Sequence, residues 1–201
     1  MGAALAEPIT VAALGDSLTQ GYGLTPEDGF VPQLQAWLDA EGADVALVNA
    51  GVSGDTTAGG LSRIGWTLTP EVDALIVALG GNDLLRGVDP DAARSNLDGI
   101  LSEATGRGLP VLLVGMDAPS NYGAEYEAAF EAIYPELAQA YGVLHHENFL
   151  GALTVIEDRN AAIQQYMQPD RIHPNRDGVA LIVADLGPKV IALYNQVEQS
   201  D

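Results

Sequence analysis

The sequence contains no cysteine, which excludes disulfide bonds, thiolate zinc sites and a cysteine nucleophile. It is also poor in positive charge, because 8 Lys and Arg stand against 28 Asp and Glu and leave a formal net charge of −20 at pH 7. A surface of this sign repels polyanions, so we expect no nucleic acid partner. No apolar run approaches the roughly 18 residues of a transmembrane helix, so we expect no stable membrane insertion.

Apolar residues, by contrast, are plentiful. They make up 47% of the 201 positions, which suits one globular domain with a sizeable core. We expect residues 9–201 to form that domain, as a monomer or a small homo-oligomer, and residues 1–8 to be an N-terminal tail. In the tail, Ala4-Leu5-Ala6 precedes Glu7-Pro8 and resembles the small-x-small end of a secretory signal peptide. These residues are interpreted equally well as a signal-peptide remnant or as an ordinary frayed terminus.

Five apolar runs of strand length recur roughly 30 residues or slightly more apart, which is the size of a βαβ unit. The runs are Ile9–Leu14, Val45–Val48, Ala74–Leu79, Val111–Val114 and Val143–His145. Their apolar character is nearly continuous rather than alternating, as in parallel strands that are buried on both faces. Helical patterns fill the intervals, and right-handed crossovers place such helices on both faces of a sheet. The sequence therefore predicts an α/β fold, a doubly wound three-layer α/β/α sandwich with a five-stranded parallel sheet.

The helical pattern is less regular in three regions of the sequence. Pro135 should kink or divide the stripe that runs from Phe130 to Tyr141. Gly187-Pro188 should stop a helix whose stripe ends at Leu186, and a last short helix should follow to about Val197. The segment 147–169 has weak periodicity, and no element is assigned to it.

Reactive groups follow the predicted strands at the edge where open parallel sheets bind ligands. The segments are Gly15-Asp16-Ser17, Asn49 to Thr56, Gly80-Gly81-Asn82-Asp83, Gly115-Met116-Asp117 and, further along, Asp170-Arg171-Ile172-His173-Pro174. A serine needs a base to act as a nucleophile. His173 alone among the three histidines has a carboxylate three residues earlier, so Asp170 can orient its ring toward Ser17. Gly54, Asn82 and the Ser17 N–H are the predicted donors to an oxyanion.

Each residue also has a structural interpretation. Ser17 or Asp16 can cap a helix, Gly54 can be a turn glycine, and Asn82-Asp83 can cap the helix after the third strand. Asp170 and His173 can be a surface pair. For each residue taken singly, the structural interpretation is as good as the catalytic one or better. Only the joint placement of these residues after parallel strands favours catalysis. A non-catalytic nucleotide- or flavin-binding module is the alternative of another class, but no G-x-G-x-x-G or Walker loop follows the first strand.

Four blocks carry a family resemblance: Gly15-Asp16-Ser17-Leu18, Gly54 within Asn-Ala-Gly-Val-Ser-Gly-Asp-Thr, Gly81-Asn82-Asp83, and Asp170-x-x-His173-Pro174. Together they resemble the GDSL, or SGNH, hydrolase family, and within it the thioesterase I / protease I / lysophospholipase L1 and arylesterase group. The resemblance implies a flavodoxin-like fold and a periplasmic or secreted location, with the cytoplasm as the alternative. It also implies a mobile loop at about Leu84 to Pro90. Arg171 stands where relatives often have glycine.

For the chemistry, the resemblance implies Ser17 as nucleophile, His173 as base and Asp170 as its orienter. It implies an oxyanion hole made of Ser17, Gly54 and Asn82, and no cofactor or metal. Asp16 is then a turn residue beside the triad and not its acid, because Asp170 has the better position. The residues expected to contact substrate are Asp16, Asp83, Leu84, Asp117 and Ile172.

The expected activity is hydrolysis of short- to medium-chain carboxylic esters, aryl esters, thioesters or lysophospholipids. A carbohydrate-ester deacetylase on the same residues is the alternative within hydrolases. Tyr122, Tyr126, Met116 and Met167 either line the acyl pocket or pack in the core. His145-His146 is interpreted as a strand end rather than a metal site, because no third ligand has a suitable spacing.

Overall fold

A computed structural model describes residues 8–118 and 120–199. The predicted signal remnant at Ala4-Leu5-Ala6 lies outside these residues. The described chain forms one parallel sheet of five strands, in the order β2-β1-β3-β4-β5. The strands are β1 (Ile9–Gly15), β2 (Val45–Gly51), β3 (Ala74–Ala78), β4 (Val111–Val114) and β5 (Leu144–His146). The predicted α/β class and the five-stranded parallel sheet are confirmed.

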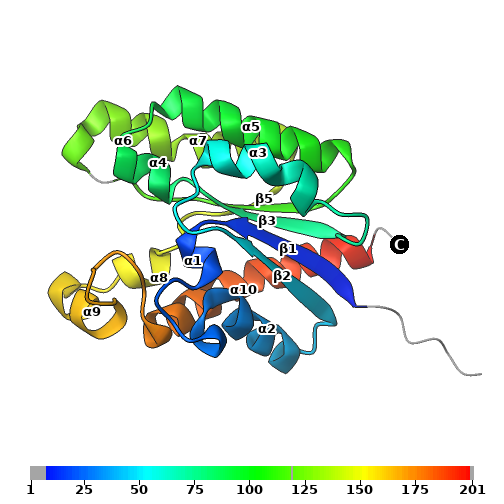
Figure 1. Cartoon of the computed structure of the whole chain (residues 1–201), viewed down its shortest axis with the longest axis horizontal. Coiled ribbons are helices and arrows are strands. Elements are labelled where there is room, and N and C mark those ends of the chain that lie inside the picture. Colours follow the sequence, from blue (N-terminus) through cyan, green and yellow to red (C-terminus); the bar gives the residue numbers. More distant parts are fainter. Residues whose placement is uncertain (1–7, 119, 200–201) are drawn as a thin grey trace, which may run out of the picture.

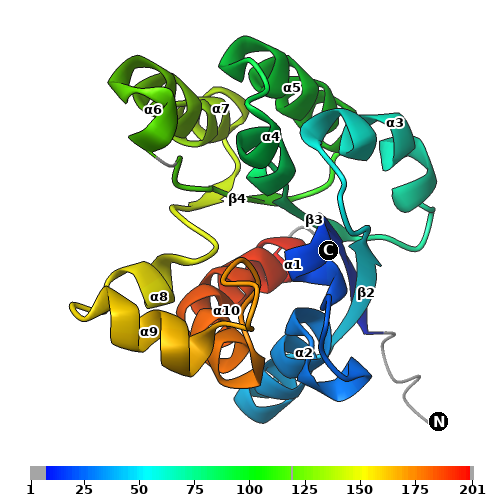
Figure 2. The same ribbon diagram turned by 60° about the vertical axis from the view of Figure 1, so that its left-hand side comes forward.

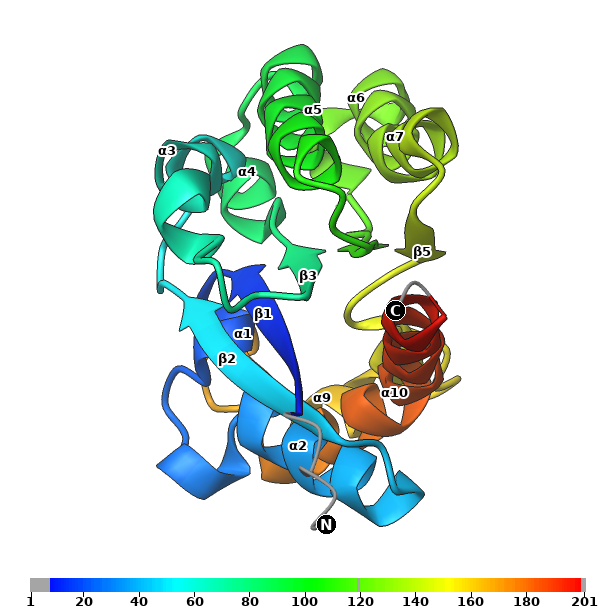
Figure 3. The same cartoon turned by 90° about the vertical axis from the view of Figure 1, so that its right-hand side faces the viewer.

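Helices cover both faces of the sheet (Figure 1). One layer contains α1 (Ser17–Gln20), α2 (Phe30–Glu41), α8 (Gly151–Thr154), α9 (Arg159–Tyr166) and α10 (Arg176–Glu198). The other contains α3 (Thr57–Thr67), α4 (Gly81–Arg86), α5 (Pro90–Gly106), α6 (Ala124–Glu131) and α7 (Ile133–Tyr141). Short 3₁₀ turns lie at Pro26–Asp28 and Ser120–Tyr122. Figures 2 and 3 show the strands between the two layers.

The core follows the apolar runs of the sequence. Every residue of β3 and β4 is 2% exposed or less, because helices cover both faces of these central strands. β2 is an edge strand, and its Val48 is 45% exposed. The register aligns Gly15, Gly51 and Ala78, so the carboxyl ends of β1, β2 and β3 meet at one edge.

One helix prediction was wrong and another is confirmed. α10 continues through Pro188 to Glu198, where a stop and a separate helix were expected. The apolar stripe continues from Leu186 to Val190, Leu193 and Val197, and burial of these residues outweighs the cost of an internal proline. The stripe around Pro135 is divided as predicted, because α6 ends at Glu131 and α7 begins at Ile133.

Helices occur in a segment to which no element was assigned and in an expected loop. α8 and α9 lie within 147–169. The expected loop from Leu84 to Pro90 is shorter than anticipated, since α4 extends to Arg86 and α5 begins at Pro90. Within the described residues, no helix has both the length and the apolar character needed to cross a membrane.

Candidate active site

The turn between β1 and α1 places Ser17 at the edge of the sheet. A side chain at Gly15 would bring its Cβ within 2.0 Å of the Thr19 Oγ1 and 3.0 Å of the Ala78 carbonyl oxygen, so only glycine fits there. Asp16 is the helix cap, because its Oδ1 accepts a hydrogen bond from the Leu18 N–H at 3.0 Å. The Ser17 hydroxyl therefore has no capping role and is left for another partner.

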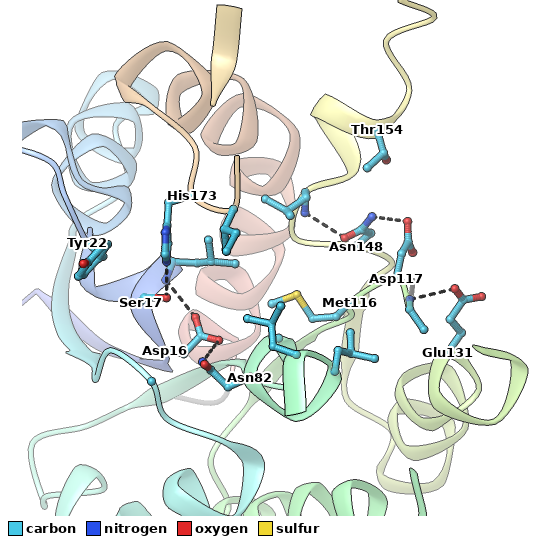
Figure 4. Close-up of a pocket in the computed structure, with 18 of the residues that line it drawn as sticks. Asp16, Ser17, Tyr22, Asn82, Met116, Asp117, Glu131, Asn148, Thr154 and His173 are labelled. Carbon is cyan, nitrogen blue, oxygen red and sulfur yellow. Dashed lines mark hydrogen bonds between the residues drawn. The ribbon is translucent and has the colours of Figure 1, made fainter. Parts of the chain in front are cut away.

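That partner is His173, which is 156 residues further along the chain. The Nε2 of His173 lies 2.9 Å from the Ser17 Oγ (Figure 4). Its Nδ1 lies 2.7 Å from Asp170 Oδ2. The other oxygen of Asp170 accepts the backbone N–H groups of Ile172 at 3.0 Å and His173 at 3.1 Å. The tight turn thus holds the carboxylate, and the carboxylate holds the ring. The Tyr22 ring packs against the His173 ring, and the two ring centroids are 4.8 Å apart.

The charge of Asp170 decides the tautomer of His173. Burial raises the pKa of the Asp170 carboxyl, but hydrogen bonds from the His173 ring and from the backbone of Ile172 and His173 outweigh it and lower the pKa to about 2. The carboxylate is therefore ionised at ordinary pH and can only accept hydrogen bonds. Nδ1 must carry the proton, and Nε2 is left free to accept the hydrogen of the Ser17 hydroxyl.

Gly54 and Asn82 lie on the wall of the same cavity as Ser17 and His173. Gly54 has a φ of +83°, a left-handed conformation that favours glycine. The Nδ2 of Asn82 donates to Asp16 Oδ2 at 3.2 Å, which fixes the orientation of the amide (Figure 4). The fold thus places four of the predicted catalytic and oxyanion residues, Ser17, Gly54, Asn82 and His173, in one cavity.

Asp16 is 2% exposed, and this burial raises the pKa of its carboxyl from an ordinary 3.8 to about 6, against the lowering effect of its hydrogen bonds with Leu18 and Asn82. The folded state binds this proton more tightly than the unfolded state does. The contribution of Asp16 to the stability of the fold is therefore greatest below pH 4, and it is lost as the pH rises through 6. The raised pKa lowers the free energy of unfolding at neutral pH by about 3 kcal/mol.

Replacement of Asp16 by asparagine is expected to raise the free energy of unfolding at pH 7 by about 1–2 kcal/mol, because the buried charge is lost together with one hydrogen bond to Asn82. The gain should vanish at pH 4, where the native carboxyl is already neutral. Urea unfolding at the two pH values measures it, with Asp39→Asn on the exposed face of α2 as the control. An equal effect of Asp16→Asn at both pH values would contradict the expectation.

The cavity has a volume of about 650 Å³. Its walls include the apolar side chains of Leu84, Leu85, Met116, Leu150 and Ile172 and the polar side chains of Asp117, Glu127, Glu131, Asn148 and Thr154. Figure 4 shows Asp117, Glu131, Asn148 and Thr154 on the side of Met116 that is away from Ser17 and His173. Burial and the nearby Glu131 raise the pKa of the Asp117 carboxyl, and a hydrogen bond from the Asn148 side chain partly offsets this. The cavity therefore combines apolar walls with a group of polar side chains on the side away from Ser17.

Four of the five predicted substrate contacts line the cavity: Asp16, Leu84, Asp117 and Ile172. The prediction for Asp83 was wrong. Its side chain is 1% exposed and points away from the cavity, with hydrogen bonds from the Thr57 N–H at 2.9 Å and the Thr57 Oγ1 at 2.6 Å. A carboxylate buried in this way ties α4 to the start of α3.

Other wall residues had no signal in the sequence. Tyr22, Leu85, Asn148 and Arg159 come from loops and short helices whose path no periodicity predicts. Met116 lines the cavity, whereas Met167, Tyr122 and Tyr126 do not, and the two tyrosine rings pack on each other with centroids 4.9 Å apart. No group of three or more His, Cys, Asp or Glu suited to a metal occurs within residues 8–118 and 120–199. His145 and His146 lie in β5, and the Nε2 of His146 is 3.5 Å from Asp185 Oδ2.

Arg171 is the one non-glycine residue with a positive φ, +59°, in the part of the chain that the structure describes. This left-handed conformation costs a residue with a side chain roughly 1–2 kcal/mol. Arg171→Gly is expected to raise the free energy of unfolding by up to about 1 kcal/mol, after the entropy of glycine is counted. Urea unfolding measures the change, and Arg171→Ala is the control because it removes the same side chain without relieving the backbone. Equal stability of the two variants would show that the conformation carries no strain.

The comparisons with known proteins agree with this geometry. The model of the GDSL-like Lipase/Acylhydrolase family matches residues 13–181. Esterase TesA of Pseudomonas aeruginosa is 40% identical over 82% of this chain and 79% of its own length. Thioesterase 1/protease 1/lysophospholipase L1 of Escherichia coli K12 is 34% identical over 92% of this chain and 85% of its own length. The crystal structure of AlinE4, an SGNH-hydrolase family esterase, is 42% identical, covers 94% of this chain and 98% of its own, and superposes with a TM-score of 0.76. The chain therefore belongs to the GDSL-like lipase/acylhydrolase family of serine ester hydrolases.

Proposed function

We propose that this protein hydrolyses carboxylic esters and thioesters through an acyl-enzyme on Ser17. The observation that carries the proposal is the continuous chain of hydrogen bonds from Ser17 through His173 to Asp170, open to a cavity of about 650 Å³. This is the arrangement of a serine nucleophile, a general base and a carboxylate that orients the base.

In the acylation step, the Ser17 Oγ attacks the carbonyl carbon while its proton passes to His173 Nε2. The bond from the carbonyl carbon to the leaving oxygen or sulfur then breaks, and Nε2 returns the proton to the leaving atom. Asp170 stabilises the imidazolium that exists between these two transfers. In the deacylation step, water attacks the acyl carbon while its proton passes to His173 Nε2. The bond from that carbon to the Ser17 Oγ then breaks, and Nε2 returns the proton to Oγ, which frees the acid and restores the serine.

The negative oxygen of the tetrahedral intermediate requires donors that are in place before the reaction. We assign this role to the backbone N–H groups of Ser17 and Gly54 and to the side-chain amide of Asn82. Asp16 engages one hydrogen of that amide, so the other is oriented for the substrate. The apolar side chains in the cavity lining favour a short- to medium-chain acyl or aryl group over a sugar.

The test is covalent labelling by an alkyl p-nitrophenyl phosphonate, which forms a stable tetrahedral adduct with an activated serine. We expect one equivalent of label on the peptide that contains Ser17, none on Ser53 in the same cavity, and loss of p-nitrophenyl butyrate hydrolysis in proportion to labelling. Hydrolysis that survives complete labelling would overturn the proposal. A series of p-nitrophenyl esters from acetate upward then measures the preferred acyl length.

Replacement of Asn82 by alanine is expected to lower kcat by about 10²–10³-fold, because it removes one donor that acts only on the transition state. KM should change little, since the planar carbonyl of the ground state is bound less strongly by these donors. Asn160→Ala, on the exposed surface of α9, is the control. A wild-type kcat in Asn82→Ala would remove Asn82 from the oxyanion hole.

We also infer a periplasmic or secreted location, which rests on the small-x-small pattern at Ala4-Leu5-Ala6, and a monomer or small homo-oligomer, which rests on the strong negative charge. Fractionation of cells that express the natural gene tests the first inference. Light scattering after size exclusion tests the second.

A further inference from the structure

The two outer donors of the proposed oxyanion hole come from segments that no backbone pairing joins. Gly54 follows β2 and Asn82 follows β3, and β1 lies between these two strands. The two strands that precede the donors are therefore about two strand spacings apart, or roughly 10 Å of sheet, and the donors reach one point only through the loops that follow these strands. An oxyanion hole works only if its donors keep a fixed spacing, so side chains must connect the two segments.

Two side chains of α4 make that connection. Asp83 binds the backbone and hydroxyl of Thr57, at the start of α3 and three residues after Gly54. Arg86, one turn beyond Asn82, donates from Nη2 to the Gly54 carbonyl oxygen at 2.8 Å. Asp83 is buried and binds the start of α3, whereas Arg86 is exposed and binds the carbonyl of Gly54 itself.

Other contacts hold the Gly54 segment to the sheet but not to α4. Arg63 binds Asp55 at 2.7 Å, and it also donates to the carbonyl oxygens of Gly15 at 2.9 Å and Ala50 at 2.8 Å. These bonds fix Asp55 relative to β1 and β2. The Asp55 N–H also donates to the Val52 carbonyl at 3.0 Å, which closes a turn around Gly54, and Arg86 adds a bond from α4 to the carbonyl of the same peptide. Gly54, with its φ of +83°, has more backbone freedom than any other residue type, so a contact on its carbonyl has the most to restrict.

We propose that Arg86 is a positioning residue, which holds the Gly54 carbonyl so that the Gly54 N–H and the Asn82 amide keep the spacing that the oxyanion needs. The inference rests on the proposed function. Arg86 touches no reacting atom, and its effect passes through Gly54. Because the contact is at the surface and a single exposed hydrogen bond adds little to stability, the residue can be changed without unfolding the protein.

The experiment compares Arg86→Met, which has no donor and no charge, with Arg86→Lys, which keeps both on a shorter side chain. Arg86→Met is expected to lower kcat by roughly 10–100-fold, because a displacement of about 1 Å in a catalytic group can cost as much as 10²-fold. KM should change little, and Arg86→Lys should be intermediate. The inhibition constant of butaneboronic acid, which forms a tetrahedral adduct with serine, should rise by the same factor as kcat falls.

Arg107→Met is the matched control. Arg107 also donates to a carbonyl of a neighbouring segment, that of Leu68 at 2.6 Å, but it lies at the end of α5 away from the cavity. Its variant should retain wild-type kcat and inhibition. Thermal unfolding of both variants is measured alongside, and the proposal requires that Arg86→Met be no less stable than Arg107→Met.

Besides a lower stability of Arg86→Met than of Arg107→Met, three results would overturn the proposal. The first is a kcat of Arg86→Met within twofold of wild type. The second is a loss that disappears at 1 M salt, where the screening length is about 3 Å, because that would mean the charge of Arg86 acts at a distance. The third is a loss in kcat without a change in boronic acid inhibition. Failure of the proposed function is distinct, since it requires that Ser17→Ala retain activity or that the wild type have none.

Discussion

Replacement of Ser17 by alanine is expected to lower kcat for p-nitrophenyl butyrate by about 10⁶-fold, the largest effect of any single change in this chain. The hydroxyl is the group that forms the covalent bond, and no other hydroxyl is hydrogen-bonded to His173 within the described residues. The fold should be unchanged, because Asp16 and not Ser17 caps α1. Residual hydrolysis above the rate in water then measures what the oxyanion donors contribute without a nucleophile.

The control for this variant is Ser62→Ala. Ser62 lies on the exposed side of α3 and donates only to the Gly59 carbonyl, so its loss should leave kcat at the wild-type value. Turnover by Ser17→Ala that remained within tenfold of wild type would mean that another group attacks the ester. Mass spectrometry of the variant during turnover of p-nitrophenyl butyrate adds a second readout, since the acyl-enzyme should be absent.

The sequence predicted the strands well because a parallel sheet that is covered on both faces requires continuous apolar runs. β4, at Val111–Val114, has the predicted bounds, whereas β2 extends three residues beyond its run, through Asn49 and Ala50 to Gly51. The extension could not be predicted from hydropathy, since β2 is an edge strand and pairs only with β1. Its bounds depend on pairing and not on burial.

The residues of the candidate site were predictable where their function requires a residue type at a strand end. Ser17, Gly54 and Asn82 each follow a different strand, and parallel topology alone brings them together. Asp83 had the same signal as Asn82, but adjacent residues of a helix point in different directions. Asn82 therefore faces the cavity and Asp83 faces Thr57. No pattern in one sequence distinguishes the two directions before the start of α4 is known.

Pro188 shows a related limit. Proline in a helix interior costs roughly 3 kcal/mol, so a stop at Gly187-Pro188 was the local expectation. The helix continues because the residues beyond it are fully buried, including Val190 and Leu193 at 0% exposure. Burial of two such side chains contributes about 3–6 kcal/mol, which exceeds the local penalty. Gly187 also has a tertiary role, since a Cβ there would come within 2.7 Å of the Trp37 ring.

Asp170→Asn is expected to lower kcat by about 10⁴-fold, although asparagine has nearly the same shape as aspartate. The reason lies in the turn. The N–H groups of Ile172 and His173 both donate to Oδ1, at 3.0 and 3.1 Å, so the atom at that position must be an oxygen that can accept them. The asparagine amide nitrogen is then forced into the place of Oδ2, 2.7 Å from His173 Nδ1.

An N–H at that position must donate, so Nδ1 becomes the acceptor and the ring proton moves to Nε2. Nε2 then faces the Ser17 hydroxyl as a donor and cannot take its proton. Nitrogen NMR of the His173 ring tests this step directly, because the protonated nitrogen should change from Nδ1 to Nε2 in the variant.

Asp158→Asn is the control for this substitution, since Asp158 also accepts a backbone N–H, that of Ala161 at 3.0 Å, but lies at the start of α9. Asparagine serves equally well as a helix cap, so kcat should be unaffected. If Asp170→Asn retained the Nδ1 proton and still lost activity, the carboxylate charge on the imidazolium would be the cause. If it retained activity within tenfold of wild type, Asp170 would have no part in orienting the base, and the turn would serve only to hold His173 in place.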